Sequence, residues 1–283
     1  IIPGDLTCNG EKESHLEFSE KLKTIQKTGT TVLVVPGNHD IYNSWARKYA
    51  ENELIKIDSI SPEEFEDIYS DYGYKDAVSR DPNSLSYLAT PAEDLWILML
   101  DSAIYDRNRF RDGPEMGGEI SPKTLEWIKE CGKLAKENNA KLLGVMHHSL
   151  MDHSEILNEN YTINNKDESI EVLQNCGVDL VLTGHIHLQD IKSHKANNKT
   201  IYDIATSCLS AYPNQYGVLE FKPKKGYYYK TSRVNIYDWA WENEIQDKNI
   251  TNFRKYSREF FKGRSYDRYY TQLLEISKYS NEE

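Results

Sequence analysis

The sequence predicts an α/β fold whose core is a largely parallel sheet. Up to residue 184, short apolar runs typical of buried strands alternate with longer segments whose apolar residues follow helical spacing. Short polar clusters follow directly after the predicted strands. A chain of 283 residues with 39% hydrophobic residues is long enough to bury a sizeable core, so we do not expect it to be disordered.

The first two elements are a helix and a buried strand. Residues 13–28 predict an amphipathic helix that stops at Gly29, and we expect its apolar face to comprise Leu16, Leu22 and Ile25. Residues 31–35 are rich in β-branched side chains and run into Pro36-Gly37, which is typical of a buried strand.

The next elements continue the alternation of helix and strand. Ser61-Pro62-Glu63-Glu64 is a capping box with proline at the first helical position, so a helix is expected from there to about Gly73. The later expected strands are residues 95–100, 141–146 and 178–182, and the later expected helices begin at Ser121-Pro122 and cover residues 168–176.

The pattern changes after Gly184. Residues 188–234 predict several short antiparallel strands, and residues from 237 onward predict helices again. We expect a main domain over residues 1–235 and a helical extension over residues 236–283. For the tyrosines of that extension (Tyr256, Tyr266, Tyr269, Tyr270 and Tyr279) we favour core packing, with a partner-docking helix as the alternative.

Charge and cysteine content exclude several classes of protein. The chain has 34 basic and 45 acidic residues, for a net charge of −11, which argues against a nucleic-acid groove or binding to an anionic membrane. No apolar run is long enough to be a membrane helix. The four cysteines are scattered without a C-x-x-C motif, so they predict neither a zinc ribbon nor a disulfide framework.

Four polar clusters lie just past predicted strands. They are Gly4-Asp5, Gly37-Asn38-His39-Asp40, His147-His148 and Gly184-His185-Ile186-His187. Because ligands bind at the carboxyl ends of strands in α/β sheets, we expect the four clusters to form one site.

The residue types in these clusters indicate a metal site. Imidazole, carboxylate and amide ligands without thiolate suit Mn, Fe, Zn or Ni, and a carboxylate such as Asp5 can bridge two cations about 3.5–4 Å apart. If His185-x-His187 is extended, both rings lie on one side and face neighbouring metals. Taken singly, Gly-Asp is usually a turn, and His-His after a strand is often a pair at the edge of the core whose imidazoles have hydrogen-bond partners. His15 and His194 are expected at the surface, while His153 either touches substrate or is a surface residue.

The ordered set of four motifs resembles the calcineurin-like metallophosphoesterase superfamily over roughly residues 1–235. Residues 61–100 and 203–212 resemble its bacterial branch related to cyclic-nucleotide phosphodiesterases. The resemblance implies a four-layer α/β/β/α sandwich of two mixed sheets with a C-terminal helical extension. It also implies a cell-envelope location in bacteria, although this chain contains no signal or membrane segment.

The resemblance assigns roles to individual residues. It implies that Asp5 bridges two divalent metal ions, that Asn38, His147 and His185 complete one metal shell, and that His187 binds the other metal. His39 would act as general acid on the leaving-group oxygen, oriented by Asp40. His148 would lie behind the ligands or near substrate, and the position of His153, six residues past His147 in a polar loop, allows the same for that residue.

The family begins with an Asp-x-His motif upstream of Gly-Asp, which this sequence lacks. We therefore expect that one of the two metals is lost and that the chain is less stable and less active than a longer parent protein. The alternative is a catalytically impaired binding or structural module.

The resemblance implies an enzyme that hydrolyses phosphoesters by attack of a metal-bound hydroxide. Its substrates would be small phosphodiesters such as cyclic nucleotides. The stretches Gly-Asp-Leu-Thr-Cys and Pro-Gly-Asn-His-Asp differ from the motifs of protein Ser/Thr phosphatases and of purple acid phosphatases. The polar loops of residues 102–119 and 150–167 flank the expected site, and we expect them to select the substrate.

Overall fold

The computed structural model describes residues 1–279 and divides into two compact units, Ile1–Ala205 and the segment that begins at Thr206. The strands of the first unit are β1 (Ile2–Pro3), β2 (Val34–Val35), β3 (Arg47–Ala50), β4 (Glu53–Lys56), β5 (Ser79–Arg80), β6 (Tyr87–Ala89), β7 (Leu95–Leu100), β8 (Lys141–Met146), β9 (Leu180–Thr183), β10 (Asp190–Ala196) and β11 (Lys199–Ala205). Its α-helices are α1 (Lys12–Gln26), α2 (Pro62–Ile68), α3 (Pro122–Glu137) and α4 (Lys166–Asn175), with two short 3₁₀ turns at Ser70–Tyr72 and Asn108–Phe110.

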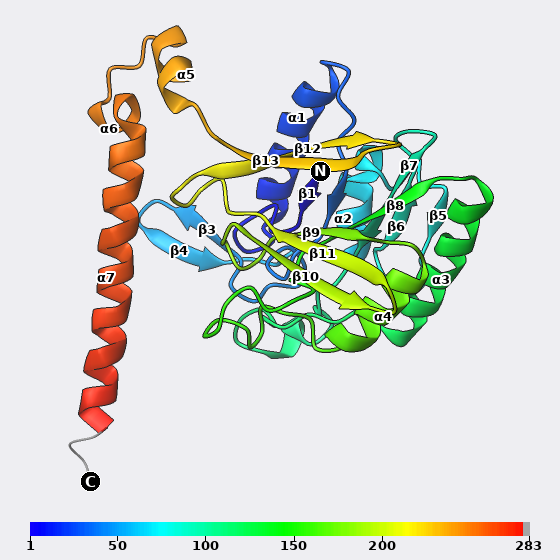
Figure 1. Ribbon diagram of the computed structural model, residues 1–283. Coiled ribbons are helices and arrows are strands. Elements are labelled where there is room, and N and C mark those ends of the chain that lie inside the picture. The colour runs from blue at the N-terminus through cyan, green and yellow to red at the C-terminus, as the bar shows by residue number, and fades with distance from the viewer. Residues whose placement is uncertain (280–283) are drawn as a thin grey trace. The chain divides into compact units, whose positions relative to one another are not determined.

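A seven-stranded mixed sheet organises the first unit (Figure 1). Its strand order is β10-β11-β9-β8-β7-β6-β5, and the four central strands β7, β8, β9 and β11 are parallel. The outer pairs are antiparallel, which gives the mixed character. Two further two-stranded sheets are present, parallel β1–β2 and the hairpin β3–β4. The predicted α/β class with several sheets is confirmed.

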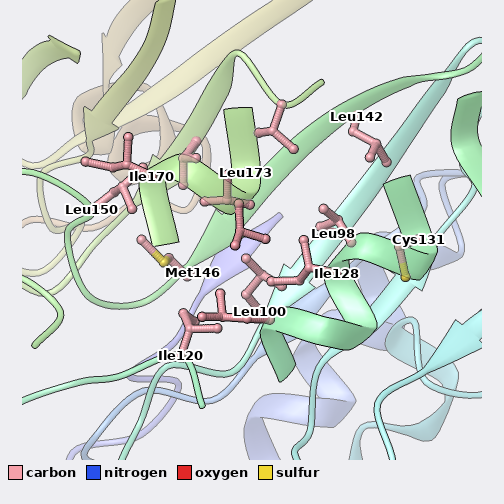
Figure 2. Packing of buried hydrophobic residues seen from close by; sticks show 14 of the residues in the cluster. Leu98, Leu100, Ile120, Ile128, Cys131, Leu142, Met146, Leu150, Ile170 and Leu173 are labelled. Atoms are coloured by element: carbon pink, nitrogen blue, oxygen red, sulfur yellow. The ribbon is translucent and has the colours of Figure 1, made fainter. Parts of the chain in front are cut away.

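The core lies between this sheet and helices α3 and α4 (Figure 2). Side chains alternate between the faces of a strand, so Leu98 and Leu100 of β7 face the helices while Ile97 and Met99 are buried on the other side. Because both faces are covered, β7 reads as a continuous apolar run rather than an alternating one. Each fully buried leucine of this kind contributes about 1.5–3 kcal/mol through removal from water.

Helix starts were predicted well because their caps are local. Ser61 accepts a hydrogen bond from the Glu64 amide and the Glu64 carboxylate accepts one from the Ser61 amide, so the expected capping box starts α2. Ser121 caps α3 through its side chain alone, which accepts a hydrogen bond from the Thr124 amide. A side-chain cap of this kind is worth about 1 kcal/mol.

The buried face of α1 differs from the prediction. Leu16 and Ile25 are 47% and 45% exposed, whereas His15 and Leu22 are buried. His15 is buried because both ring nitrogens have polar partners, Nδ1 with the Tyr69 hydroxyl at 2.8 Å and Nε2 with the Asp40 carbonyl at 3.1 Å. The expectation of a surface histidine at position 15 was therefore wrong.

The strand expected at residues 31–35 is shortened to Val34–Val35, because its partner β1 offers only the register pairs Ile2–Val34 and Pro3–Val35. Of the antiparallel strands expected over residues 188–234, β10 and β11 join the seven-stranded sheet.

The second unit contains a hairpin and three helices. Strands β12 (Gln215–Lys222) and β13 (Gly226–Arg233) pair with each other, and α5 (Ile236–Glu242), α6 (Lys248–Thr251) and α7 (Phe253–Tyr279) follow. The expected helical extension is confirmed.

Core packing of the α7 tyrosines is not what the structure shows. Tyr256, Tyr266, Tyr269 and Tyr270 are between 41% and 68% exposed, and the side chain of Tyr279 lies outside the described residues. Over residues 1–279, no helix combines the length and apolarity needed to cross a membrane.

Candidate metal centre

Four loops that follow strands bring their polar side chains to one point in the first unit. Asp5 follows β1, Asn38 follows β2, His147 follows β8 and His185 follows β9. Ligand atoms of Asp5, His147 and His185 all lie within 4.8 Å of one another. The predicted convergence at the carboxyl ends of the strands is therefore present in the geometry.

The Nε2 atom of His147 is at the centre of this group. It lies 3.1 Å from Asn38 Oδ1, 3.1 Å from His185 Nδ1 and 3.4 Å from Asp5 Oδ2. His147 and Asn38 are almost completely buried, whereas the Asp5 side chain is 23% exposed. The cluster is thus open to solvent on the Asp5 side.

Backbone carbonyls fix the protonation of the two imidazoles. His147 Nδ1 donates to the Pro3 carbonyl at 2.7 Å, and His185 Nε2 donates to the Asn160 carbonyl at 3.0 Å. In the neutral rings, His147 Nε2 and His185 Nδ1 therefore carry lone pairs. Asn38 Nδ2 donates to the Met116 sulfur at 3.3 Å, which directs Oδ1 toward the cluster.

With both imidazoles neutral, four electron-pair donors face one another with no proton between them. A carboxylate, an amide oxygen and two imidazole nitrogens repel unless a cation lies among them, and metal-bound histidines characteristically donate their other N–H to a carbonyl. The residues present fit a divalent metal ion.

The electrostatics of the cluster favour the metal-binding protonation states of His185 and Asp5, whereas the Asp5 carboxylate raises the pKa of His147 against the effect of burial. Burial, together with the nearby His147, lowers the pKa of His185 to about 3, so this ring stays neutral at ordinary pH. Burial alone would raise the pKa of Asp5, but the adjacent His147 and His39 lower it well below its usual range. A neutral imidazole and an ionised carboxylate are the forms that bind metals.

Two glycines allow the loops to approach each other. A Cβ on Gly37 would lie 2.3 Å from Asp5 Oδ1, and a Cβ on Gly4 would lie 2.6 Å from His147 Nδ1. Gly4 also has a φ of +90°, which disfavours other residues. The glycines of the first two motifs are therefore required by the close packing around Asp5.

Three site residues adopt the left-handed conformation that non-glycine residues rarely take. The φ angles are +53° at Asp5, +60° at His185 and +56° at His187. Such strain costs about 1–3 kcal/mol per residue and is concentrated at functional sites. The extended His185-x-His187 segment that we predicted is therefore wrong, and the segment turns through an Ile186 amide to Gly184 carbonyl hydrogen bond.

This turn separates the two histidines. His185 is buried in the cluster, whereas His187 is exposed and is not among the three residues whose ligand atoms converge. The pKa of His187 is lowered by partial removal from water and is affected by the charges of Asp5, His147 and His39. His187 is thus near enough for these charges to act on it, but its side chain is exposed and does not join the cluster.

His39 lies beside Asp5 and is held by a backbone carbonyl. Its amide donates to Asp5 Oδ1 at 3.2 Å, and its ring Nδ1 donates to the Cys8 carbonyl at 2.9 Å. Among the described residues, the His39 ring does not make the expected contact with the Asp40 carboxylate. The Asp40 carboxylate instead accepts hydrogen bonds from the backbone amides of Leu6, Thr7 and Gly37. Asp40 therefore holds the loop after β1 against the loop after β2.

His148 is buried directly behind the cluster, with its ring centre 5.0 Å from that of His147 and 4.5 Å from that of His185. Its Nδ1 pairs with the Ser102 hydroxyl at 2.9 Å and its Nε2 with the Met116 carbonyl at 3.2 Å. Both ring nitrogens of His148 are therefore engaged by groups of the chain.

His153 is buried, so the surface interpretation was wrong. Its Nδ1 lies 3.0 Å from Asp190 Oδ2 and its Nε2 lies 3.0 Å from Asp203 Oδ2, the latter as an ion pair without hydrogen-bond geometry. Burial would lower the pKa of His153, but the two carboxylates raise it. His153 therefore joins the loop after β8 to the sheet strands β10 and β11.

Sequence reasoning missed the groups that hold the ligands. The Pro3, Cys8 and Asn160 carbonyls and the Met116 sulfur fix His147, His39, His185 and Asn38. Backbone carbonyls leave no side-chain signature, so no motif announces them. Met116 and Asn160 do lie in the two loops predicted to flank the site.

Two family models match the sequence. A family model described as calcineurin-like phosphoesterase matches residues 1–189. A second model, described as the C-terminal domain of cyclic nucleotide phosphodiesterase, matches residues 235–283. No curated protein matches the sequence.

Two solved structures are similar to this chain at low identity. A dimetal phosphatase from Danio rerio has 12% identity and a TM-score of 0.48, with 79% of each chain covered. GAP50, described as the anchor in the inner membrane complex of Plasmodium, has 13% identity and a TM-score of 0.35, with 74% of this chain and 71% of that chain covered. The assignment rests on the first family model, which spans most of the chain: this protein belongs to the calcineurin-like phosphoesterase family.

Proposed function

We propose that this chain is a phosphodiesterase that hydrolyses small phosphodiesters such as cyclic nucleotides. Its family membership makes it a metal-dependent phosphoric ester hydrolase. The diester preference is supported by the second family model, which describes the C-terminal domain of cyclic nucleotide phosphodiesterase and matches residues 235–283. We also infer that the catalytic domain covers residues 1–235 and the C-terminal domain residues 236–283.

One observation carries the proposal most directly. Asp5, Asn38, His147 and His185 direct four proton-free ligand atoms at one point, with backbone carbonyls holding both imidazoles in the required tautomer. We propose that these residues bind one divalent cation and that Asp5 shares a second cation with His187. When bound, such cations supply Lewis acidity and neutralise charge at the phosphate.

His39 is suited to the proton transfer. Its Nδ1–H is committed to the Cys8 carbonyl, so Nε2 is the atom that holds or gives up the catalytic proton. The hydrogen bond from its backbone amide to the Asp5 carboxylate keeps the ring next to the proposed metal ligands. We propose that protonated Nε2 gives its proton to the leaving oxygen, a step worth about 10²–10⁴-fold in rate.

An aromatic surface lies next to His39. The Trp45 ring is 6.4 Å from the His39 ring and 43% exposed, and it packs on Gly113, where a Cβ would come within 2.6 Å of the indole. A fixed, half-exposed indole beside the proton donor suits a leaving group that carries a flat ring, as a nucleoside does. This favours a diester with a nucleoside over inorganic or small aliphatic phosphates.

A second candidate is a catalytically impaired module with the same fold. This alternative is favoured by the position of His187, which is exposed and does not join the cluster. The second metal would then have Asp5 as its one ligand from the cluster. The two functions differ in one measurement, because an impaired module binds metal without turnover.

Hydrolysis of matched ester substrates tests the proposal. Mn-loaded protein is expected to cleave bis(p-nitrophenyl) phosphate and cyclic AMP faster than p-nitrophenyl phosphate. The His39→Ala variant is expected to lose about 10²-fold or more in kcat, while His194→Ala, on the exposed strand β10, keeps full activity. A preference for the monoester would contradict the diester assignment, and absence of turnover by metal-loaded protein would favour the impaired module.

A further inference from the structure

A cleft in the second unit lies between three segments that are distant in sequence. Its walls are residues 212–214, the end of β13 with the segment that leads into α5, and the first turns of α7. Its volume is about 800 Å³. Small-molecule sites have volumes of about 300–1,000 Å³, so the cleft is of a size that accepts a ligand.

Asn214 holds the three walls together. It is buried, its Oδ1 accepts from the Ser257 hydroxyl of α7 at 2.7 Å, and its Nδ2 donates to the Leu209 carbonyl at 2.9 Å. Its carbonyl accepts from the Val234 amide at 2.9 Å. The helix, the end of the hairpin and the loop are thus joined at one buried side chain, and the cleft is formed before any ligand arrives.

The lining of the cleft is strongly cationic although the whole chain has a net charge of −11. Arg233, Arg254, Lys255 and Arg258 line it, with Glu259 as the acidic residue among the lining. Within residues 1–279, none of these four cations has a carboxylate within 4 Å, and Glu259 lies 3.8 Å from Lys262. The cleft therefore presents an uncompensated positive charge.

Two of these cations are arranged for an anion. Arg254 and Arg258 are four residues apart on α7, so their side chains extend from the same face of the helix. Like charges at this spacing repel, and an anion between them removes that repulsion. Guanidinium groups are the side chains best suited to phosphate, because they donate two parallel hydrogen bonds.

Aromatic side chains border the same cleft. Tyr212, Tyr237 and Phe253 contribute to the lining, and the Tyr237 ring is 58% exposed. Such rings offer flat surfaces on which a base can stack. We propose that this cleft binds a small phosphorylated ligand with an aromatic ring, of the nucleoside monophosphate class, at a site separate from the metal centre.

The test uses the full chain freed of metal with EDTA, so that binding at the metal centre does not contribute. Isothermal titration with adenosine monophosphate at low salt is expected to show one site per chain. Adenosine, which lacks the phosphate, is expected to bind at least tenfold more weakly. The double variant R254Q/R258Q is expected to weaken adenosine monophosphate binding at least tenfold.

The matched control is R264Q/R268Q, which removes two arginines at the same spacing on the same helix but outside this cleft. It is expected to leave binding within twofold of the wild type. Equal losses in both double variants would show general charge attraction and overturn the proposal. Absence of saturable binding would also overturn it, as would binding to phosphatidylglycerol vesicles without binding to the nucleotide. Hydrolysis by Mn-loaded protein is a separate readout, so absence of nucleotide binding in this cleft would leave the proposed phosphodiesterase function intact.

Discussion

The strand ends of the first unit and the first turns of α7 both gather charged or polar side chains, but they hold them in opposite ways. At the strand ends, His147 and His185 are buried and each is fixed by a backbone carbonyl. On α7, Arg254 and Arg258 are exposed and have no carboxylate partner among the described residues. Lone pairs fixed by backbone carbonyls select a cation by geometry, whereas exposed guanidinium groups select an anion mainly by charge.

The largest expected effect comes from breaking the fixed arrangement. His147→Ala removes the central ligand atom, and we expect hydrolysis of bis(p-nitrophenyl) phosphate to fall by about 100-fold or more, because even the residues that support metal ligands are worth 10–100-fold. His194→Ala is the matched control, since that side chain is exposed on β10. If His147→Ala retained more than a tenth of the activity, the ligand assignment would be wrong.

A second pair of substitutions compares the aromatic residues of the two regions. Phe65 in α2 is fully buried, whereas Phe260 in α7 is 57% exposed. We expect Phe65→Ala to lower the free energy of unfolding of the first unit by about 3–5 kcal/mol and Phe260→Ala to change stability by less than about 0.5 kcal/mol. Urea titration followed by circular dichroism measures both. A loss above 2 kcal/mol in Phe260→Ala would restore the core-packing interpretation of α7.

A third substitution tests whether His15 is held as the structure indicates. Tyr69→Phe removes the hydroxyl that pairs with His15 Nδ1 and leaves a buried polar atom without its partner. We expect a loss of about 1–3 kcal/mol in the free energy of unfolding. Tyr49→Phe is the control, because Tyr49 is 86% exposed. Equal stability of the two variants would mean that the buried His15–Tyr69 pair contributes nothing.

The smallest expected effect depends on pH. The carboxylates of Asp203 and Asp190 outweigh burial and raise the pKa of His153 in the folded chain. A raised folded pKa stabilises the protein below the unfolded value of about 6.5, and that stability is lost as pH rises through the folded value.

We therefore expect His153→Gln to cost about 1–2 kcal/mol in urea titrations at pH 6 and clearly less at pH 9. The control His194→Gln should show no such pH dependence. A cost that is the same at both pH values would mean that His153 is neutral in the folded protein.

The sequence predicted what local chemistry determines. The capping box at Ser61, the continuous apolar run of β7 and the four polar clusters after strands were all visible, because each depends on neighbouring residues or on strand periodicity. The roles of individual ligands remain predictions that the experiments above address.

The rest depended on contacts between distant segments. His15 looked like a surface residue and the place of His153 stayed open, because their partners, Tyr69 and Asp203, are about 50 positions away in the sequence. The turn at His185 was missed because its left-handed backbone is stabilised by tertiary packing, which no alternating pattern encodes. The exposed aromatic residues of α7 follow helical spacing, yet spacing alone does not say what covers them.

Metal content per chain tests the central claim most directly. Wild-type protein loaded with Mn and then freed of excess metal is to be analysed for metal per chain, beside the double variant His147→Ala/His185→Ala. We predict at least one metal ion per wild-type chain and at least a tenfold lower content in the double variant. A second ion would support the site shared by Asp5 and His187. Wild-type protein without bound metal, or equal metal content in the variant, would contradict the account.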